Sequence, residues 1–127
     1  MTLCSNVFVY GTLKKGMGNH DLLGDSDFLG ECVIPGTLIN LGAFPAYIIT
    51  EEKGTVTGEV YELKEPVFLT LDRLEGYPDF YNRVLRETPF GEAWVYYIPA
   101  SWREDYSYEI IESGVWTPEL REKPLWL

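Results

Sequence analysis

Glu75 is the carboxylate of this 127-residue chain that is best placed to move protons. It follows Leu71 and Leu74 at helical spacing, so the three side chains are expected on one helix face that is otherwise apolar. Burial at the end of such a stripe should raise the pKa of a carboxyl group toward the range of a general acid and base. The structural alternative is a helix C-terminal carboxylate paired with Arg83 or Arg73.

The opening of the chain is a second candidate, for binding an anion. Asn6 to Tyr10 is rich in β-branched and aromatic residues and predicts a buried strand. Gly11 follows at once and permits φ > 0, so successive backbone N–H groups of the turn can point into one concavity. An ordinary loop after a buried strand explains the same residues, and this stretch alone does not separate the two interpretations.

A sheet and one main helix are needed to position these groups. The helix is predicted from Pro66 to the stop at Gly76 and Pro78, with Phe68 and Leu69 on its apolar face and Asp72 off it, in solvent. A short helical turn is predicted between Asn19 and Gly24, and the chain from Pro99 on is expected to be irregular. Period-two patterns predict strands over 6–10, 28–34, 37–41, 46–49, 55–63, 82–88 and 92–98. These elements indicate one mostly β, α+β domain over residues 1–127.

Charge and hydropathy exclude several classes of partner. The net charge is −10, whereas proteins that bind nucleic acids or anionic membranes usually carry a basic face. No apolar run approaches the length of a membrane span, and the first residues lack the pattern of a secretion signal. We therefore expect a cytoplasmic protein with no nucleic-acid and no membrane partner.

Metal and nucleophile chemistry lack signatures. The chain has two cysteines, Cys4 and Cys32, which are expected to be free thiols, and no CxxC motif. With His20 as the one histidine, a zinc site is not expected, and His20 is predicted to anchor a loop by a hydrogen bond. Tyr77, Tyr81, Tyr96 and Tyr97 are expected in the core or in a pocket wall.

Two long motifs together resemble the signatures of the gamma-glutamylcyclotransferase-like family. The first is Val7-Phe8-Val9-Tyr10-Gly11-Thr12-Leu13-Lys14-x-Gly16-x-x-Asn19-His20, and the second is Leu71-Asp72-x-x-Glu75-Gly76-x-Pro78-x-x-Tyr81-x-Arg83. Shorter stretches are similar to weaker motifs of the family: Gly58 to Tyr61, Ala93 to Tyr96, and Ser113-Gly114-x-Trp116. The resemblance covers nearly the whole chain.

The resemblance implies a small, closed, mixed β-barrel with flanking helices. It implies that the backbone N–H groups of Tyr10, Gly11, Thr12 and Leu13 bind a γ-glutamyl group, that Glu75 is the general acid and base, and that Tyr96 contacts the substrate. In the family reaction the α-amine of a γ-glutamyl group attacks its own γ-carbonyl, giving 5-oxoproline and a free amine, amino acid or peptide, with no cofactor.

Three functional hypotheses remain open on the sequence. The first is a cyclotransferase that uses Glu75, and the second is a non-catalytic module that binds γ-glutamyl groups or small anions. The third is an interaction protein that uses the aromatic tail from Trp116 to Leu127. Because the substrate and the protein are both anionic, recognition needs local donors, for which Lys14, Lys15 and Arg83 are the nearest candidates in sequence. The leaving group and the oligomeric state are not encoded in any motif.

Overall fold

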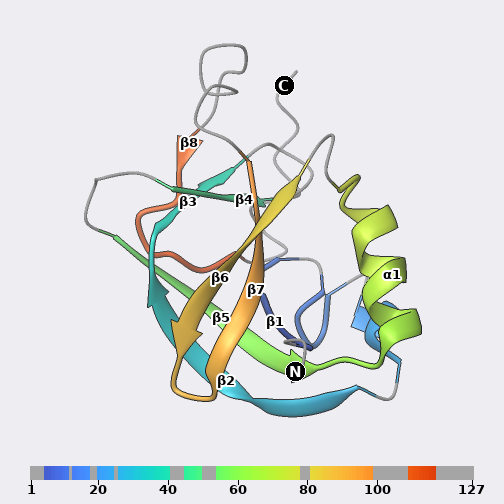
Figure 1. Ribbon diagram of the computed structural model, residues 1–127. Coiled ribbons are helices and arrows are strands. Elements are labelled where there is room, and N and C mark those ends of the chain that lie inside the picture. Colours follow the sequence, from blue (N-terminus) through green and yellow to red (C-terminus); the bar gives the residue numbers. More distant parts are fainter. Residues whose placement is uncertain are drawn as a thin grey trace.

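A mixed β-sheet forms the body of the molecule, shown as a computed structural model in Figure 1. The structure describes residues 5–11, 13–17, 20–24, 26–40, 45–49, 54–77, 81–98 and 109–116. Its eight strands are β1 (Asn6–Val9), β2 (Asp27–Pro35), β3 (Thr37–Asn40), β4 (Pro45–Ile48), β5 (Thr55–Glu62), β6 (Asn82–Thr88), β7 (Gly91–Tyr97) and β8 (Glu109–Ile110). The helices are the 3₁₀ turn η1 (His20–Leu23) and α1 (Glu65–Leu74).

The first strand lies in the middle of this sheet. The strand order is β2-β5-β1-β7-β4-β3-β8, and β6 pairs with β7 outside this path. β1 runs antiparallel to β5 and parallel to β7, with Val7 opposite both Tyr61 and Trp94. Phe8 and Val9 are buried like Val7, as expected for a strand with neighbours on both edges.

The α+β class predicted from the sequence is confirmed, with one main helix beside the sheet (Figure 1). The ladders that join the described strands leave β2 and β8 at the two ends of the path, so a closed barrel is not confirmed. β6 has the predicted bounds, and the other predicted strands are found within one or two residues. β8 falls in a stretch predicted to be irregular, because a two-residue strand is too short to show an alternating pattern.

The buried face of α1 differs from the predicted stripe. Leu71 is fully buried, whereas Leu69 is 54% exposed and Leu74 is 42% exposed. Val67, Phe68, Leu71, Asp72 and Glu75 are the side chains that lie partly or fully inside, and the last four follow the spacing i, i+3, i+4, i+7. The prediction that Leu69 and Leu74 belong to the buried face was therefore wrong. It grouped apolar residues only, whereas the polar residue Asp72 is part of the buried face.

Candidate active site

The end of α1 holds Glu75 in a fixed position. Gly76 takes a left-handed conformation with φ +67°, and its N–H donates to the carbonyl of Arg73 at 3.2 Å. The N–H of Tyr77 donates to the carbonyl of Asp72 at 2.9 Å. These two bonds form a Schellman motif, which satisfies the last carbonyls of the helix and ends it at the predicted glycine.

Glu75 is a half-buried carboxyl group with no hydrogen-bond or ion-pair partner among the described residues. Burial raises its pKa to about 7, in the direction expected from its place on the helix. Its side chain makes no hydrogen bond and no ion pair with any described residue. The pairing with Arg83 considered from the sequence is not formed, because Arg83 contacts Asp72 instead.

Three buried tyrosines surround this carboxyl group. Burial raises the pKa values of Tyr10, Tyr81 and Tyr96, and the negative charge of Glu75 raises each of them further. The backbone N–H of Tyr81 also donates to the Glu75 carbonyl at 3.1 Å. The structure therefore brings two residues predicted for the substrate, Tyr10 and Tyr96, to the predicted general acid and base.

The tyrosine hydroxyls are held by the backbone of the sheet. The hydroxyl of Tyr10 donates to the carbonyl of Tyr96 at 2.7 Å and accepts the N–H of Tyr47 at 2.9 Å. The hydroxyl of Tyr81 donates to the carbonyl of Pro45 at 2.7 Å. These bonds fix both side chains in the protein interior. Tyr81 and Tyr96 are buried as predicted, whereas Tyr77, which was also expected in the core or in a pocket wall, is exposed.

The turn after β1 is built around a close approach at Gly11. A Cβ atom at this position would lie 2.7 Å from Cγ of Pro45, so a side chain cannot be accommodated there. The expected positive φ at Gly11 is absent from the described backbone, and the glycine is needed for space instead. The N–H of Lys14 donates to the Gly11 carbonyl at 3.1 Å and closes the turn.

Two N–H groups of this turn are unused by the described part of the chain. No described residue accepts a hydrogen bond from the backbone N–H of Gly11 or Leu13. Thr12, the other predicted substrate-binding residue between them, lies outside the described residues. A strand-to-loop turn with free donors is what anion binding requires.

The far side of the turn is anchored to the rest of the molecule. Nδ1 of His20 donates to the Leu13 carbonyl at 3.0 Å, which confirms the loop-anchoring role predicted for this histidine. Nζ of Lys14 donates to the carbonyl of Trp116 at 2.7 Å, and burial lowers the pKa of this lysine. Trp116 is itself fully buried, so the start of the predicted aromatic tail packs on its own domain.

Glu59 of β5 is a second buried carboxylate, and its hydrogen bonds are made within the protein. Its Oε1 accepts the N–H of Lys15 at 3.0 Å and the hydroxyl of Tyr61 at 2.9 Å. Its charge also acts on the buried Lys14. No sequence motif marked Glu59 as an anchor for the turn after β1, although it lies in the Gly58-to-Tyr61 stretch.

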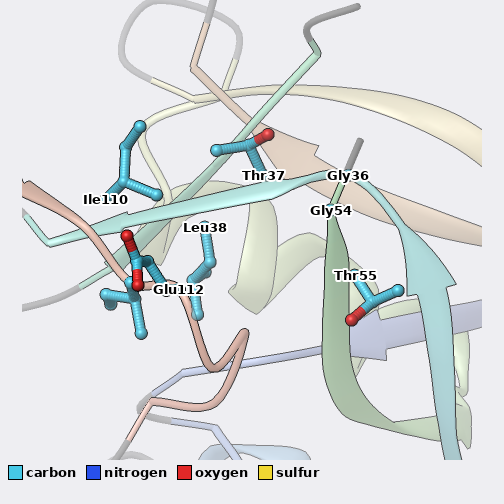
Figure 2. Close-up of a pocket in the computed structure, with 8 residues that line it drawn as sticks. Gly36, Thr37, Leu38, Gly54, Thr55, Ile110 and Glu112 are labelled. Carbon is cyan, nitrogen blue, oxygen red and sulfur yellow. The ribbon is translucent and has the colours of Figure 1, made fainter. Parts of the chain in front are cut away.

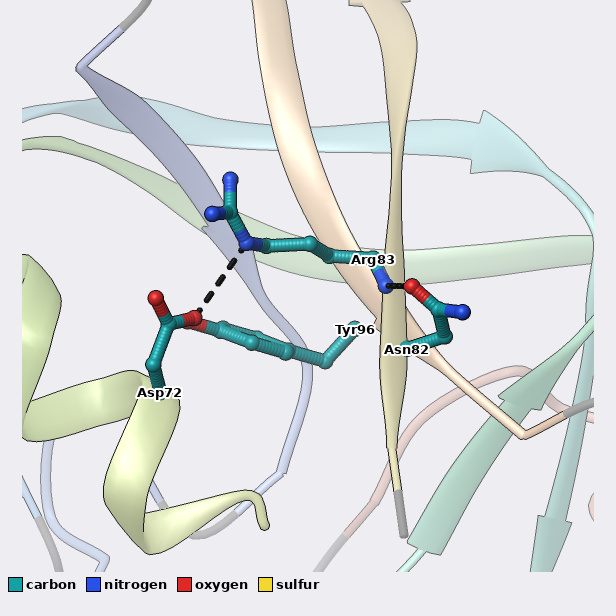
Figure 3. Close-up of polar contacts among 4 residues, drawn as sticks. All are labelled: Asp72, Asn82, Arg83 and Tyr96. Carbon is teal, nitrogen blue, oxygen red and sulfur yellow. Dashed lines mark hydrogen bonds and ion pairs between the residues drawn. The ribbon is translucent and has the colours of Figure 1, made fainter. Parts of the chain in front are cut away.

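Asp72 joins the site through a polar network that the sequence prediction missed (Figure 3). The hydroxyl of Tyr96 donates to Oδ1 of Asp72 at 2.6 Å, and Nε of Arg83 lies 3.2 Å from the same oxygen. The side chain of Asp72 is only 17% exposed. The expectation that Asp72 is solvated was therefore wrong, because it lies at the i+4 position of the buried stripe.

A separate hollow of about 160 Å³ lies on other elements (Figure 2). Its one carboxylate is Glu112, which is exposed. None of the predicted site residues lines this hollow. The lining residues are Gly36, Thr37, Leu38, Gly54, Thr55, Ile110, Ile111 and Glu112.

A metal-binding cluster and a membrane-spanning helix are both absent from the described residues. No group of three or more histidine, cysteine, aspartate or glutamate side chains there could hold a metal ion. In the same residues, no helix has the length and apolar character needed to span a bilayer. Cys32 is a free, buried thiol, and Cys4 lies outside the described residues.

Glu75 at a glycine-capped helix end, with its charge acting on the buried Tyr10, can be compared with known proteins. Residues 7–118 match the family model described as gamma-glutamyl cyclotransferase, AIG2-like. The chain belongs to this family. A Vibrio cholerae protein provisionally named as a gamma-glutamylcyclotransferase is 42% identical over 112 residues, which are 87% of this chain and 93% of the relative.

Solved structures of gamma-glutamylcyclotransferase-like proteins agree with the fold. The solution structure of YtfP from Escherichia coli has a TM-score of 0.70 and 33% identity, covering 90% of this chain and 97% of that one. The crystal structure of an AIG2-like protein from Mus musculus has a TM-score of 0.68 and 28% identity, covering 80% of this chain and 81% of that one. The family suspected from the two sequence motifs is thus confirmed.

Proposed function

We propose that this protein is a gamma-glutamylcyclotransferase that converts a γ-glutamyl compound into 5-oxoproline and a free amine, amino acid or peptide. The observation that carries the proposal is Glu75, a half-buried carboxyl group with a pKa of about 7 and no partner among the described residues. A carboxyl group with this pKa exists in both protonation states near neutral pH, as a group that accepts and then returns a proton requires. Family membership supports the same reaction class.

The proposed reaction is intramolecular and needs no second substrate. The α-amine nitrogen attacks the γ-carbonyl carbon, a C–N bond forms, and a five-membered ring with a tetrahedral carbon results. Glu75 takes the proton from the attacking nitrogen and gives it to the departing nitrogen, whose bond to the former γ-carbonyl carbon breaks. Since nucleophile and electrophile are parts of one molecule, the protein has to fold the substrate and move one proton.

The raised pKa of Glu75 decides whether this proton transfer is feasible. An α-ammonium group titrates near ~8, so its transfer to an ordinary glutamate near ~4.3 is uphill by roughly 5 kcal/mol. Transfer to Glu75, with its pKa of about 7, is uphill by only about 1.4 kcal/mol. Desolvation of one side chain thus removes most of this barrier component.

The turn after β1 is the proposed binding site for the γ-glutamyl group. The N–H groups of Gly11 and Leu13 supply donors that no described residue uses, and Tyr10 and Thr12 complete the proposed set. Donors fixed in a turn can stabilise the substrate carboxylate or the oxyanion that develops at the γ-carbonyl. Tyr96 is proposed to line the site, with its hydroxyl oriented by Asp72.

A screen of γ-glutamyl compounds for release of 5-oxoproline tests the proposal. γ-Glutamyl amino acids, γ-glutamyl peptides and γ-glutamylamines are incubated with wild type and with Glu75→Gln, and the product is separated and quantified. We expect release by wild type from at least one class and a loss of most turnover in the variant. Binding of 5-oxoproline to wild type without turnover of any compound would favour the alternative, a non-catalytic γ-glutamyl or small-anion binding module.

A further inference from the structure

Arg83 presents a guanidinium group whose N–H donors make no hydrogen bond with any described residue. Its side chain is 20% exposed, and its Nε lies 3.2 Å from Oδ1 of Asp72 as an ion pair. Nε is buried and lacks an aligned acceptor, and no other side-chain nitrogen of Arg83 donates to a described residue. A guanidinium carries five N–H donors, and a buried donor without an acceptor is costly. The group is therefore suited to an acceptor from outside the described chain.

Three aromatic rings hold this guanidinium in place. Its central carbon lies 4.8 Å from the ring centre of Phe68, 4.5 Å from that of Tyr77 and 4.4 Å from that of Trp94. Its two terminal nitrogens are directed away from Asp72 (Figure 3). A stacked guanidinium has already lost rotamer freedom and part of its hydration. Its two terminal nitrogens, called the fork below, can therefore bind a carboxylate at a smaller cost in entropy and desolvation.

Asp72 connects this guanidinium to the proposed site. Nε of Arg83 and the hydroxyl of Tyr96 both contact Oδ1 of Asp72, at 3.2 Å and 2.6 Å. Arg83 lowers and Glu75 raises the pKa of Tyr96, whose pKa is raised mainly by burial. Both charges therefore act on one hydroxyl group, and Arg83 pairs with Asp72 and not with Glu75.

The other two basic side chains singled out as local donors from the sequence contact other parts of the molecule. Nζ of Lys14 donates to the carbonyl of Trp116, and Nζ of Lys15 lies 3.6 Å from the ring centre of Phe28. Of the three, Arg83 is the one that contacts Asp72, the acceptor of the Tyr96 hydroxyl.

We infer that Arg83 binds a carboxylate on the leaving half of the substrate and so selects γ-glutamyl amino acids and peptides over γ-glutamylamines. This inference rests on the proposed function. In a γ-glutamyl amino acid the carboxylate is two bonds from the departing nitrogen, and a bidentate pair with the Arg83 fork positions that nitrogen for protonation. The carboxylate of the glutamyl half is assigned to the turn after β1, at the other end of the substrate.

A pair of substrates that differ in one carboxylate tests the inference. γ-Glutamyl-L-alanine and γ-glutamylethylamide share the glutamyl half, and the second lacks only the carboxylate of the leaving group. We expect wild type to favour γ-glutamyl-L-alanine in kcat/KM by about 10- to 100-fold, the range of a charge-assisted bidentate contact. Arg83→Gln should lose this preference, because kcat/KM should fall much further for γ-glutamyl-L-alanine than for γ-glutamylethylamide.

Arg86→Gln is the matched control. Arg86 lies on the same strand three residues further on, which places it on the opposite face of β6, and its Nη1 donates to the carbonyl of Leu85 at 3.2 Å. The control removes the same charge and should keep the preference. Because Arg83→Gln leaves Asp72 without its cation, the double variant Asp72→Asn/Arg83→Gln is measured beside it, and both are checked by thermal melting.

Two results overturn the inference. One is a wild type that treats both compounds alike, and the other is an equal loss for both compounds in the Arg83 variants. Binding of the two compounds to Glu75→Gln, with and without Arg83→Gln, is measured by calorimetry. If wild type releases 5-oxoproline from no compound of the wider screen, the proposed function fails. A carboxylate preference in binding that disappears with Arg83 then still supports the assignment of the fork, and equal binding overturns it.

Discussion

The carboxyl groups of Glu59 and Glu75 have opposite surroundings. Glu59 in β5 accepts hydrogen bonds from Lys15 and Tyr61, and it lies near the buried ammonium of Lys14. Glu75 at the end of α1 has no hydrogen-bond or ion-pair partner for its side chain in the described structure. A carboxylate with donors stabilises the fold as an anion, whereas one without donors exchanges a proton near neutral pH.

The strongest test of this contrast is Glu75→Gln. We expect turnover to fall by about 10²- to 10⁴-fold, the usual contribution of a positioned acid and base, because the amide cannot take the ammonium proton. Affinity for 5-oxoproline should persist, since the turn after β1 is untouched. Steady-state kinetics and calorimetry measure the two effects, with Glu65→Gln at the exposed start of α1 as the control. Wild-type turnover in Glu75→Gln would make Glu75 structural.

Glu59→Ala should have the converse effect. The N–H of Lys15 and the hydroxyl of Tyr61 would lose their acceptor, and we expect the free energy of unfolding to fall by about 3–4 kcal/mol. Urea denaturation measures this, with Glu62→Ala on the same strand as the exposed control. Turnover of the folded fraction should fall by less than about tenfold, because proton transfer at Glu75 remains. A fall as large as that of Glu75→Gln would place Glu59 in the chemistry.

The pH dependence of stability separates the two carboxylates in a third way. The folded-state pKa of Glu75 is raised from 4.5 to about 7, so the folded protein holds a proton that the unfolded chain releases between these values. The free energy of unfolding should therefore fall as pH rises from about 4.5 to 7, by up to about 3 kcal/mol from this group. Glu75→Gln should lack this component, which makes it more stable than wild type at pH 8 and similar at pH 4.5. Parallel curves for the two proteins would contradict the raised pKa.

Asp72→Asn should give the smallest effect. The amide oxygen can still accept the hydroxyl of Tyr96, but the charge that faces Arg83 is lost, and we expect a decrease in stability of about 1–2 kcal/mol. Denaturation at pH 7 measures it against the Glu65→Gln control. A stability equal to wild type would restore the earlier view of Asp72 as a solvated residue.

Local patterns predicted most of the helices and strands. The alternation of apolar residues along a strand and a glycine that ends an element are both properties of residues that are neighbours in the chain. The strand ending before Gly11 and the helix ending before Gly76 are both found where the sequence indicates them. The raised pKa of Glu75 followed from its helical spacing, and the catalytic and binding roles of Glu75, Tyr96 and the turn after β1 stay predictions.

The missed features depend on partners that are distant in the chain. Asp72 was assigned to solvent because its acceptor role is visible only when β6 and β7 bring Arg83 and Tyr96 to it. Gly11 was explained by backbone conformation, whereas the structure shows a steric need that Pro45 creates from another strand. A local sequence pattern carries no information on such long-range contacts until the order of the strands in the sheet is known.

The central place of β1 has a consequence for how the chain is made. β1 is synthesised before the other strands of the sheet, but its two neighbours are β5 and β7, and the acceptor of the Lys14 ammonium lies 102 positions later. The growing chain therefore exposes both edges of an apolar strand until β5 is made and one edge until β7 is made, and such non-local pairing folds slowly. A nascent or truncated chain that ends before β7 is therefore expected to be a target for chaperones and proteases.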